Sequence, residues 1–524
     1  MIIESSEFGR IEVSDIPLPE EIDSDVNGTY TFSGRVLVAV RKPDKDKDWY
    51  RVFTMEDDGT KVCELFDGII PQKKGANGIR WMCYTDNKRI LLGDYVLECT
   101  PNLDCCASSK LVDVVLPEEV AAIPGIFMRW SEPIIAPDNE HICFSTLTGT
   151  GAYNFLGKLV KREKAYVVED ACIISTVNDI EPDSENEGFY RRNIQRGGEV
   201  KQFVRGGRGI TLAGGGRSIS ESTLQMLDSE AFCQITDTLG YEETAILSPN
   251  EKYAVCMSPR FSPETDCGVL GVVPLYNDIV TRGRYLNVLY QYAIAGVRFM
   301  RPGNIGPALI DVEMSMKEGR AYEGVNLSDP EGKWVYYSPM SWHPDSTRAL
   351  WNEGTRLCQG NVKSRLRRCR LLDRAPSAPV PALRTPDKEE IPYARPLSYA
   401  LEQKATKLPL KIKGTGGAVT NSCIAVDTYE TLYENYSEDG RTFYDGWIRV
   451  KAPANMFMPG ETVIESDIHV TGEHTGRMEL RIVLQADEHF QIHPDRGADA
   501  DGNPRSFGFA EYDGIRRNVA DMAD

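Results

Sequence analysis

The stretch GYEETAILSPNEKYAVCMS, residues 240–258, has the pattern of a strand, a tight turn and a second strand. Residues of alternating character flank Ser248-Pro249-Asn250, as in strands that bury one face. Proline at the first central position of a turn, followed by Asn or Asp, favours a tight chain reversal. The stretch therefore predicts a β-hairpin, with two carboxylates, Glu242 and Glu243, just before its first strand.

The same design recurs along the chain. Alternating residues run into a related turn and then resume in three other segments, residues 79–93, 132–146 and 338–352. A pattern that returns at a fixed spacing is typical of a fold built from repeated supersecondary units.

The spacing of the turns gives the repeat length. Thr85 and Pro137 are 52 residues apart, Pro137 and Pro249 are 112 apart, and Pro249 and Pro344 are 95 apart. A unit of about 45–55 residues fits if each longer gap hides a less regular copy. The candidates for these hidden copies are residues 208–228 and 295–313.

These turns, together with the half-repeat FTMEDDGTKVCELFDG (53–68), resemble the TolB-like family of β-propeller repeats. The resemblance implies an all-β fold in which residues 28–373 form a propeller of seven blades, preceded by an N-terminal strap at 1–27. A β-sandwich also shows alternation, but a fixed period of this length favours radial blades. The propeller fold by itself does not specify an activity.

The composition changes after residue 373. Residues 374–407 are rich in proline and predict a semi-extended linker. Residues 408–524 contain further alternating segments and predict a C-terminal β-sandwich-like domain. Residues 284–300 have helical apolar spacing, which predicts an insertion between blades that covers the mouth of the central channel.

Composition limits the partners. The formal net charge of -19 disfavours nucleic acid and anionic membranes. There is no basic-then-apolar leader, and no apolar run approaches the ~20 residues that span a bilayer. The 13 cysteines contain no C-x-x-C pair and read as buried thiols in a reducing compartment. We expect a soluble cytoplasmic protein that takes a small-molecule substrate, with homo-oligomerisation through the C-terminal domain left open.

The resemblance also implies where a site would lie. In a TolB-like blade the innermost strand precedes the Ser-Pro-Asp turn, so residues about five to eight before the turn proline lie at the channel mouth. This offset selects the following side chains: Arg80, Arg129, Trp130, Glu132, Glu242, Glu243 and Tyr337, together with Arg208 and Arg298 from the irregular copies.

These residue types suit proton transfer. A desolvated glutamate, Glu242 or Glu243, can act as the base, and Tyr337 can donate to a developing oxyanion. The arginines, with Trp130 and Glu132, would bind a polar substrate. The alternative is that arginines and glutamates of neighbouring blades pair only to fasten the channel.

A metal is a separate question. Oligogalacturonate lyases are TolB-like propellers that hold a divalent metal through histidines before such turns, whereas this chain has Glu242, Glu243 and Tyr337 there. Only the location of the site transfers from that resemblance. In the C-terminal region, His469, His489 and His493 lie near carboxylates and are candidate metal ligands, with solvated surface histidines as the alternative. No cofactor is certain, and a divalent metal stays open.

Two function classes follow. No G-x-S-x-G, H-E-x-x-H or G-x-x-x-x-G-K-[ST] motif occurs. We therefore expect an enzyme that works by proton transfer, a lyase, isomerase or hydratase, on a small polar substrate that is anionic or polyhydroxylated. The alternative is a non-catalytic propeller scaffold for protein–protein contacts.

Overall fold

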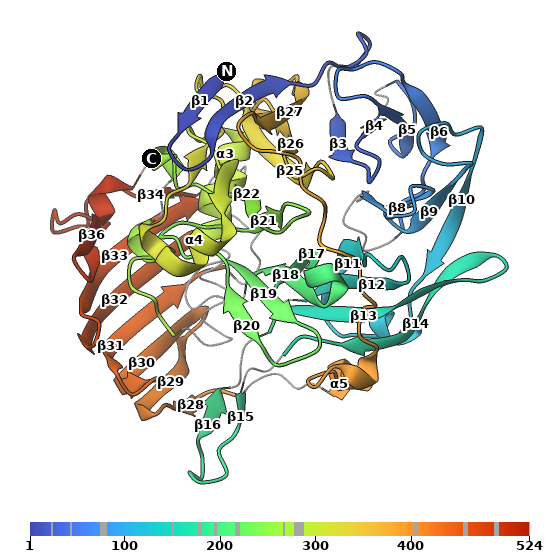
Figure 1. Ribbon diagram of the computed structural model, residues 1–524. Coiled ribbons are helices and arrows are strands. Elements are labelled where there is room, and N and C mark those ends of the chain that lie inside the picture. The colour runs from blue at the N-terminus through green and yellow to red at the C-terminus, as the bar shows by residue number, and fades with distance from the viewer. Residues whose placement is uncertain are drawn as a thin grey trace.

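The computed structural model describes residues 1–22, 25–41, 44–73, 81–148, 151–176, 180–192, 196–214, 221–265, 268–276, 288–402, 407–453, 460–486 and 492–522. It is an all-β architecture in which small sheets surround a common axis, with one large sheet beside them (Figure 1). The predicted fold class is thus confirmed in its main part, a β-propeller followed by a second β-rich region.

Each blade is an antiparallel sheet whose strands follow one another in the chain. Blade 1 contains β3 (Val26–Tyr30), β4 (Val36–Arg41), β5 (Trp49–Met55) and β6 (Cys63–Ile69). Blade 2 contains β7 (Trp81–Cys83), β8 (Arg89–Leu92), β9 (Tyr95–Thr100) and β10 (Ser108–Val115). Blade 3 contains β11 (Ile126–Ile135), β12 (His141–Thr148), β13 (Gly151–Lys161) and β14 (Ala165–Ile173). The outer strands β10 and β14 pair in parallel and join blades 2 and 3 into one sheet.

The remaining blades follow the same plan. Blade 4 contains β17 (Glu199–Val204), β18 (Gly209–Ala213), β19 (Ser222–Met226) and β20 (Phe232–Gln234). Blade 5 contains β21 (Thr244–Leu247), β22 (Tyr253–Met257), β23 (Ala308–Asp311) and β24 (Val325–Asn326). Blade 6 contains β25 (Val335–Trp342), β26 (Arg348–Gly354) and β27 (Ser364–Leu371), and its outer strands are β2 (Gly9–Asp15) and β1 (Ile2–Ser5).

The first strands of the blades form the inner ring. Strand β3 lies beside β25, and the series continues through β21, β17, β11 and β7. Blades 1 and 2 share an apolar core that includes Leu37, Val52, Ile90 and Leu97. The N-terminal strands pair with the last blade, Asp15 opposite Arg367, so residues predicted to be a strap instead close the ring. A closed ring of antiparallel blades is the arrangement of a β-propeller.

The described strands group into six blades, one fewer than predicted. The difference lies in the gap between Pro249 and Pro344. Strand β22 ends at Met257 and β23 begins at Ala308, so an insertion, residues 258–307, lies inside blade 5. Residues 295–313 are therefore part of this insertion and of β23, not a hidden repeat. The other hidden copy, 208–228, does correspond to a blade, since it spans β18 and β19.

The turns that follow the inner strands share one geometry. At Ser248-Pro249-Asn250-Glu251, the Glu251 amide donates to the Ser248 carbonyl over 2.7 Å, and Glu251 has φ 59°. The Asn250 side chain accepts from the Lys252 amide at 3.0 Å, which is why Asn or Asp recurs at this position. The same positive φ occurs at the equivalent positions Asn87, Asn139 and Ser346.

The proline-rich linker crosses the propeller side that carries these turns, here called the turn face. Its backbone amides donate in chain order to three blades: Ser377 to the Asp345 carbonyl, Val380 to the Pro249 carbonyl and Leu383 to the Gly206 carbonyl, over 2.8–3.0 Å. In Figure 1 the linker is the orange trace that passes β17 and β11 toward α5 (Ser398–Glu402). The linker therefore covers the turn face.

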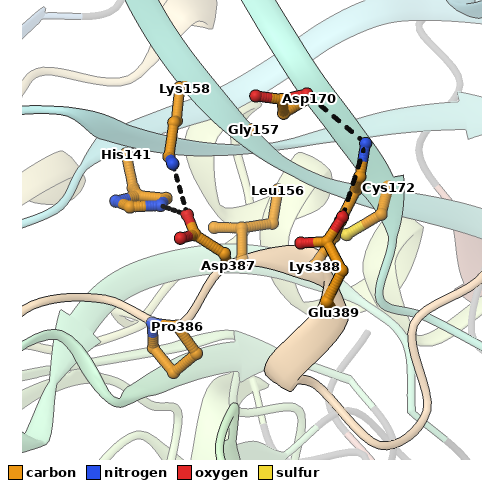
Figure 2. A pocket seen from close by; sticks show the side chains of 10 residues that line it. All are labelled: His141, Leu156, Gly157, Lys158, Asp170, Cys172, Pro386, Asp387, Lys388 and Glu389. Carbon is orange, nitrogen blue, oxygen red and sulfur yellow. Dashed lines mark hydrogen bonds and ion pairs between the residues drawn. The ribbon is translucent and has the colours of Figure 1, made fainter.

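A buried histidine anchors the linker to blade 3. His141 Nδ1 lies 2.7 Å from Asp138, and its Nε2 lies 3.1 Å from Asp387 of the linker. Lys158 Nζ is 2.5 Å from the same Asp387 oxygen, as Figure 2 shows. A cavity of about 100 Å³ lies between these side chains and the short helix η7 (Lys388–Glu390). The anchor is a small charged contact between the linker and strands β12 and β13.

The C-terminal region is one antiparallel sheet in the described ranges, not a two-layer sandwich. Its own strands are β28 (Leu410–Lys413), β29 (Gly416–Ala425), β30 (Thr428–Ser437), β31 (Thr442–Lys451), β32 (Glu461–Gly472), β33 (Gly476–Ala486), β34 (Ile492–Pro494), β35 (Phe507–Tyr512) and β36 (Ile515–Asn518). A hairpin from between blades 3 and 4 extends this sheet, with β15 (Ile180–Pro182) and with β16 (Tyr190–Arg192) parallel to β28.

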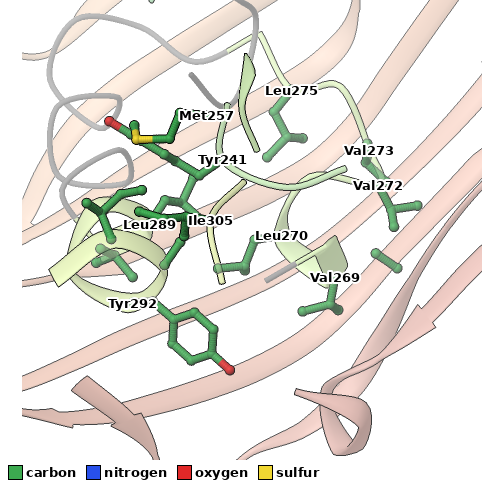
Figure 3. Close-up of a cluster of buried hydrophobic side chains, with 14 of the residues drawn as sticks. Tyr241, Met257, Val269, Leu270, Val272, Val273, Leu275, Leu289, Tyr292 and Ile305 are labelled. Carbon is green, nitrogen blue, oxygen red and sulfur yellow. The ribbon is translucent and has the colours of Figure 1, made fainter. Parts of the chain in front are cut away.

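The insertion of blade 5 takes the place of a second sheet. The Tyr444 hydroxyl donates to the Pro274 carbonyl over 3.1 Å, and the Tyr276 ring packs on Tyr436 and Tyr444. Figure 3 shows the apolar side chains of the insertion in front of the C-terminal strands. One apolar core therefore spans blades 5 and 6, the insertion and the C-terminal sheet.

Helices are short and connect strands. They are α1 (Glu118–Ala121), η1 (Arg205–Gly207), η2 (Pro263–Thr265), η3 (Gly268–Leu270), η4 (Gln291–Ala295), α3 (Gly296–Phe299), α4 (Val312–Glu318), η5 (Gly319–Ala321), η6 (Leu357–Gln359) and η8 (Val519–Asp521). Of the predicted 284–300 helix, the structure describes residues 288–300, and residues 288–299 are helical. None of the helices in the described ranges has the length and apolar character needed to cross a bilayer.

Candidate functional site

Charged and polar side chains from four blades and the insertion meet at the inner strands. Glu132 comes from β11, Glu199 and Lys201 come from β17, Glu243 directly precedes β21, and Tyr336 lies in β25. Arg298 of α3 approaches from the insertion. We call Glu132, Glu199, Lys201, Glu243, Arg298 and Tyr336 the inner-strand cluster. These groups are far apart in the chain, and the ring of blades brings them together.

Breaks in the strand register shape this cluster. The pairing of β17 with β18 shifts between Val200 and Gln202, which makes Lys201 the extra residue of a bulge. The pairing of β11 with β12 shifts between Ser131 and Ile134, and Glu132 there has φ 46°. Bulges reorient side chains and occur often beside functional sites. Two members of the cluster therefore point where regular strand alternation would not send them.

Lys201 is the centre of the cluster. Its Nζ lies 3.0 Å from Glu199, 3.5 Å from Glu243 and 3.7 Å from Glu132. Its side chain is 5% exposed, whereas each of the three carboxylate side chains is about one-fifth exposed. Burial alone lowers the pKa of Lys201, but the three carboxylates outweigh burial and raise it. Lys201 thus stays a cation, and the carboxylates border solvent.

Glu243 is the carboxylate whose proton affinity the site changes most clearly. Loss of hydration raises the pKa of Glu243, and the negative charges of Glu199 and Glu132 add to this effect. The cations Lys201 and Arg298 partly oppose it. A carboxyl group with a raised pKa exchanges protons closer to neutral pH, as a general acid or base must.

A buried hydroxyl faces the same cluster without a partner. Tyr336 is 0% exposed, and its hydroxyl makes no hydrogen bond. Burial raises the pKa of Tyr336, and the charges nearest to it include Arg298, Glu243 and Lys201. An unsatisfied buried hydroxyl costs about 1–3 kcal/mol, so a polar ligand that accepts from it would recover part of that cost.

Arg298 lies near this hydroxyl and also contacts Tyr337. The Arg298 guanidinium lies 4.9 Å from the Tyr337 ring centroid, and its Nε has no hydrogen-bond partner. The Tyr337 hydroxyl donates to the Arg298 carbonyl at 3.5 Å. Burial raises the pKa of Tyr337 as well. Tyr337, which was selected from the sequence, therefore already uses its hydroxyl. The hydroxyl without a partner belongs to its neighbour Tyr336.

Glu242 points away from the cluster. It is 0% exposed and accepts from Arg260 Nε at 2.9 Å, while its other oxygen has no partner. Glu221 lies nearby, where burial and the charge of Glu242 raise its pKa well above the usual range. Glu242 therefore belongs to a separate buried ion pair, and of the two neighbouring glutamates only Glu243 faces Lys201.

The other selected residues lie elsewhere. Trp130 is buried between blades 2 and 3, where its Nε1 donates to the Gly93 carbonyl at 3.2 Å. Arg208 pairs with Asp228 at 2.9 Å and is 43% exposed. These two side chains make packing and surface contacts. Arg80 and the side chain of Arg129 lie outside the described part of the chain.

The C-terminal histidines lie far apart. His469 of β32 pairs with Arg477 of β33, and His493 of β34 pairs with Gln485 of β33. These two partners are eight residues apart on β33, which is about 27 Å. His489 lies outside the described residues. No group of three or more His, Cys, Asp or Glu side chains in the described ranges is placed to hold a metal ion.

Sequence reasoning did not select Glu199, Lys201 or Tyr336. The sequence does contain a signal for Glu199 and Lys201. In the turn at 205–208, Gly206 stands where the other turns have proline, and five to eight residues before it are residues 198–201. Glycines replace the Pro-Asp letters there, so the turn is hard to recognise. The direction of the Lys201 side chain also depends on a bulge, for which the sequence gives no signal.

Known proteins resemble this chain only in outline. No protein-family model matches the sequence, and no curated protein matches it. Among solved structures, TolB from Acinetobacter baumannii is 13% identical with a TM-score of 0.30, covering 69% of this chain and 68% of its own. A putative TolB from Agrobacterium tumefaciens is 11% identical with a TM-score of 0.29, covering 61% and 87%.

A third similar structure is prolyl oligopeptidase B from Galerina marginata, 8% identical with a TM-score of 0.27, covering 78% of this chain and 46% of its own. At these scores, the strand order and ring closure described above define the fold. The chain is an all-β propeller with a C-terminal sheet.

Proposed function

We propose that the protein is an enzyme that moves a proton at the inner-strand cluster, as a lyase, isomerase or hydratase acting on a small polyhydroxylated substrate. The observation that supports this most directly is Glu243, whose pKa burial raises, beside the cation Lys201 and an unpartnered Tyr336 hydroxyl. A base, a fixed cation and a free donor are the groups that proton abstraction next to a carbonyl requires.

In the proposed reaction Glu243 takes a proton from the substrate and later returns it to the same or a neighbouring atom. The electron pair left behind moves onto a substrate oxygen. Tyr336 donates a hydrogen bond to that oxygen, and Arg298 stabilises its negative charge. Lys201 holds Glu243 in place and stabilises its ionised form. A single raised-pKa carboxyl group that acts as base and then as acid suits isomerisation or elimination.

The exposed carboxylates favour a substrate that carries hydroxyl groups. Glu132, Glu199 and Glu243 are each about one-fifth exposed around Lys201, so a bound substrate would meet carboxylate oxygens. An anion would be repelled by the partly exposed carboxylates. Hydroxyl groups, in contrast, can donate to the carboxylates and accept from Tyr336.

We propose the cytoplasm as the compartment of the reaction. The 12 cysteines of the described residues are all free thiols. Free thiols persist in a reducing environment.

Proton abstraction can be tested without knowing the product. A panel of neutral sugars and polyols is incubated with the protein in D₂O, and loss of C–H signals is followed by NMR. We expect exchange at one carbon of at least one compound, and we expect Glu243→Gln to lower its rate by about 10²–10⁴-fold. Tyr336→Phe should slow exchange while leaving thermal stability unchanged or raised, because it removes an unsatisfied hydroxyl.

Glu242→Gln is the matched control. It changes the neighbouring glutamate, which pairs with Arg260 rather than with Lys201. It should lower stability and leave the exchange rate of the folded protein within a few-fold. Equal rates for the wild type and Glu243→Gln, or no exchange with the whole panel, would contradict the proposal.

A non-catalytic scaffold is the second candidate. The hairpin that joins β29 and β30 exposes apolar side chains at its tip, with Ile424 47% and Val426 85% exposed. Such side chains suit a protein contact, including one between C-terminal sheets of two copies. Sedimentation of the wild type and Val426→Asp over a concentration series tests this, since a scaffold contact predicts association that the charge abolishes.

A further inference from the structure

Three thiols meet at the junction of blades 1 and 2. Cys63 begins β6, Cys99 lies in β9, and Cys106 lies in the loop between β9 and β10. The Cys106 amide donates to Cys63 Sγ over 3.2 Å, which joins the two blades. The Cys99 thiol lies near the Cys106 thiol. The sequence separates these residues by 36 and 43 positions, and the blade junction brings them together.

The three thiols differ in access. Cys63 and Cys106 are partly exposed, whereas Cys99 is 4% exposed within the core of blades 1 and 2. Cys106 lines a surface cavity of about 780 Å³ that Arg51, Phe66 and Ser108 also line. A small oxidant can therefore reach Cys106 and Cys63 from solvent, but Cys99 is protected by its burial.

The hydrogen bonds assign different roles to the two accessible thiols. The Cys106 backbone amide points at Cys63 Sγ, and the Cys63 thiol itself makes only a long contact of 4.0 Å with the Glu64 carbonyl. A backbone N–H aimed at a sulfur favours the attack of that sulfur on an oxidant. The Cys106 thiol donates to the Ser108 carbonyl over 3.2 Å, a shorter contact than that of the Cys63 thiol. Cys63 suits the role of the thiol that is oxidised first, and Cys106 suits that of the resolving thiol.

We propose that Cys63 and Cys106 form a reversible disulfide in response to a peroxide, which links blade 1 to blade 2. The Cys63 thiolate attacks one peroxide oxygen, the O–O bond breaks, and Cys63 becomes a sulfenic acid with release of water. The Cys106 sulfur then displaces the sulfenic oxygen as a second water, and the S–S bond forms. Two thiols and one hydrogen peroxide thus give one disulfide and two waters.

This pair lies on β6 and on the β9–β10 loop, so it does not depend on the function proposed for the inner strands. The disulfide would close a chain segment of 43 residues. It would restrict the unfolded state and the separation of the two blades. We therefore expect the oxidised protein to melt about 5 °C higher than the reduced protein.

The test uses the full chain, hydrogen peroxide at stoichiometric excess, blocking of free thiols, and peptide mapping by mass spectrometry with and without dithiothreitol. We expect one dithiothreitol-sensitive link between the peptides that contain Cys63 and Cys106. Cys63→Ser and Cys106→Ser should each abolish this link and the rise in melting temperature. Cys105→Ser and Cys358→Ser are matched controls at exposed cysteines, and both should keep the link.

Three results would overturn the proposal. They are a link through Cys99 or Cys105 in place of Cys63, conversion of Cys63 and Cys106 only to higher oxides, and full retention of both free thiols. Serine is close in size to cysteine, so none of the four serine variants should disturb the packing. If a variant loses the link and its circular dichroism spectrum is unchanged, the loss reports the missing thiol and not unfolding.

Discussion

The linker anchor at His141 should depend on pH in a direction that its contacts fix. Both imidazole nitrogens face carboxylate oxygens, of Asp138 and Asp387, so both must carry protons for both hydrogen bonds to form. Burial alone would lower the pKa of His141, but these hydrogen bonds and charges outweigh burial and raise it. Lys158 and Arg384 also contact Asp387 and share its charge.

The sign follows from the raised pKa. An unfolded histidine has a pKa of about 6.5, so the anchor contributes fully below that pH and is lost as the pH rises through the higher folded value. Asp138 stays ionised throughout, because His141 and backbone amides lower its pKa. Two hydrogen bonds to charged groups are worth about 1.5–3 kcal/mol each, less the cost of burying the ring. We take about 2 kcal/mol as the expected net value, which is about 30-fold in an opening equilibrium.

Hydrogen exchange of the linker measures this local opening. The Thr385 amide, which donates to Asp138, and the Leu383 amide, which donates to Gly206, are compared in the wild type and His141→Gln at pH 6 and pH 9. The variant should exchange about 30-fold faster at pH 6, after correction for intrinsic rates, and the difference should shrink toward pH 9. The Val380 amide, bonded to blade 5, is the internal control and should change less. An equal difference at both pH values, or a larger one at pH 9, would refute the reasoning.

Three further substitutions test the energetics of the fold by urea denaturation. Lys201→Met leaves three carboxylates without their buried cation and should cost about 3–5 kcal/mol, and a loss below 1 kcal/mol would contradict the buried cluster. Gly34→Ala should lower the free energy of unfolding more than Gly125→Ala. Both glycines have positive φ, but a Cβ at Gly34 would lie 2.3 Å from His343 Nε2, whereas one at Gly125 would meet open space. Equal losses of stability would argue against the contact with His343. Trp130→Ala should cost about 3–5 kcal/mol by leaving a cavity between blades 2 and 3, and a near-neutral result would mean that the site is not packed as described.

The turns show how much of the fold the sequence specifies. Proline and Asp or Asn at fixed positions encode the reversal after an inner strand, so these letters locate the blades that carry them. The turn at 204–208 uses glycines with positive φ instead and is harder to recognise. The described strands form six blades where seven were predicted, because an insertion and an extra repeat lengthen a gap equally. Nothing in residues 258–307 marks them as packing on another sheet.

Counting residues along the sequence reaches part of the inner-strand cluster and misses the rest. Counting back from the turns selects Glu132 and Glu243, and the structure places both within 3.7 Å of Lys201. The count along the sequence cannot choose between Glu242 and Glu243. Neighbouring residues point in opposite directions, and only the tertiary structure shows which direction is inward. Lys201 was missed because a bulge, not alternation, directs its side chain.

The closure of the ring in blade 6 has a consequence for protein synthesis. Strand β2 pairs with β27, and Asp15 is separated from its partner Arg367 by 352 residues. At about 5–20 residues per second, a ribosome needs roughly 20–70 s to deliver the partner strand. During that interval the nascent chain carries an unpaired strand edge near its start, a surface that sticks to other chains. We expect the emerging polypeptide to need a chaperone until β27 leaves the exit tunnel.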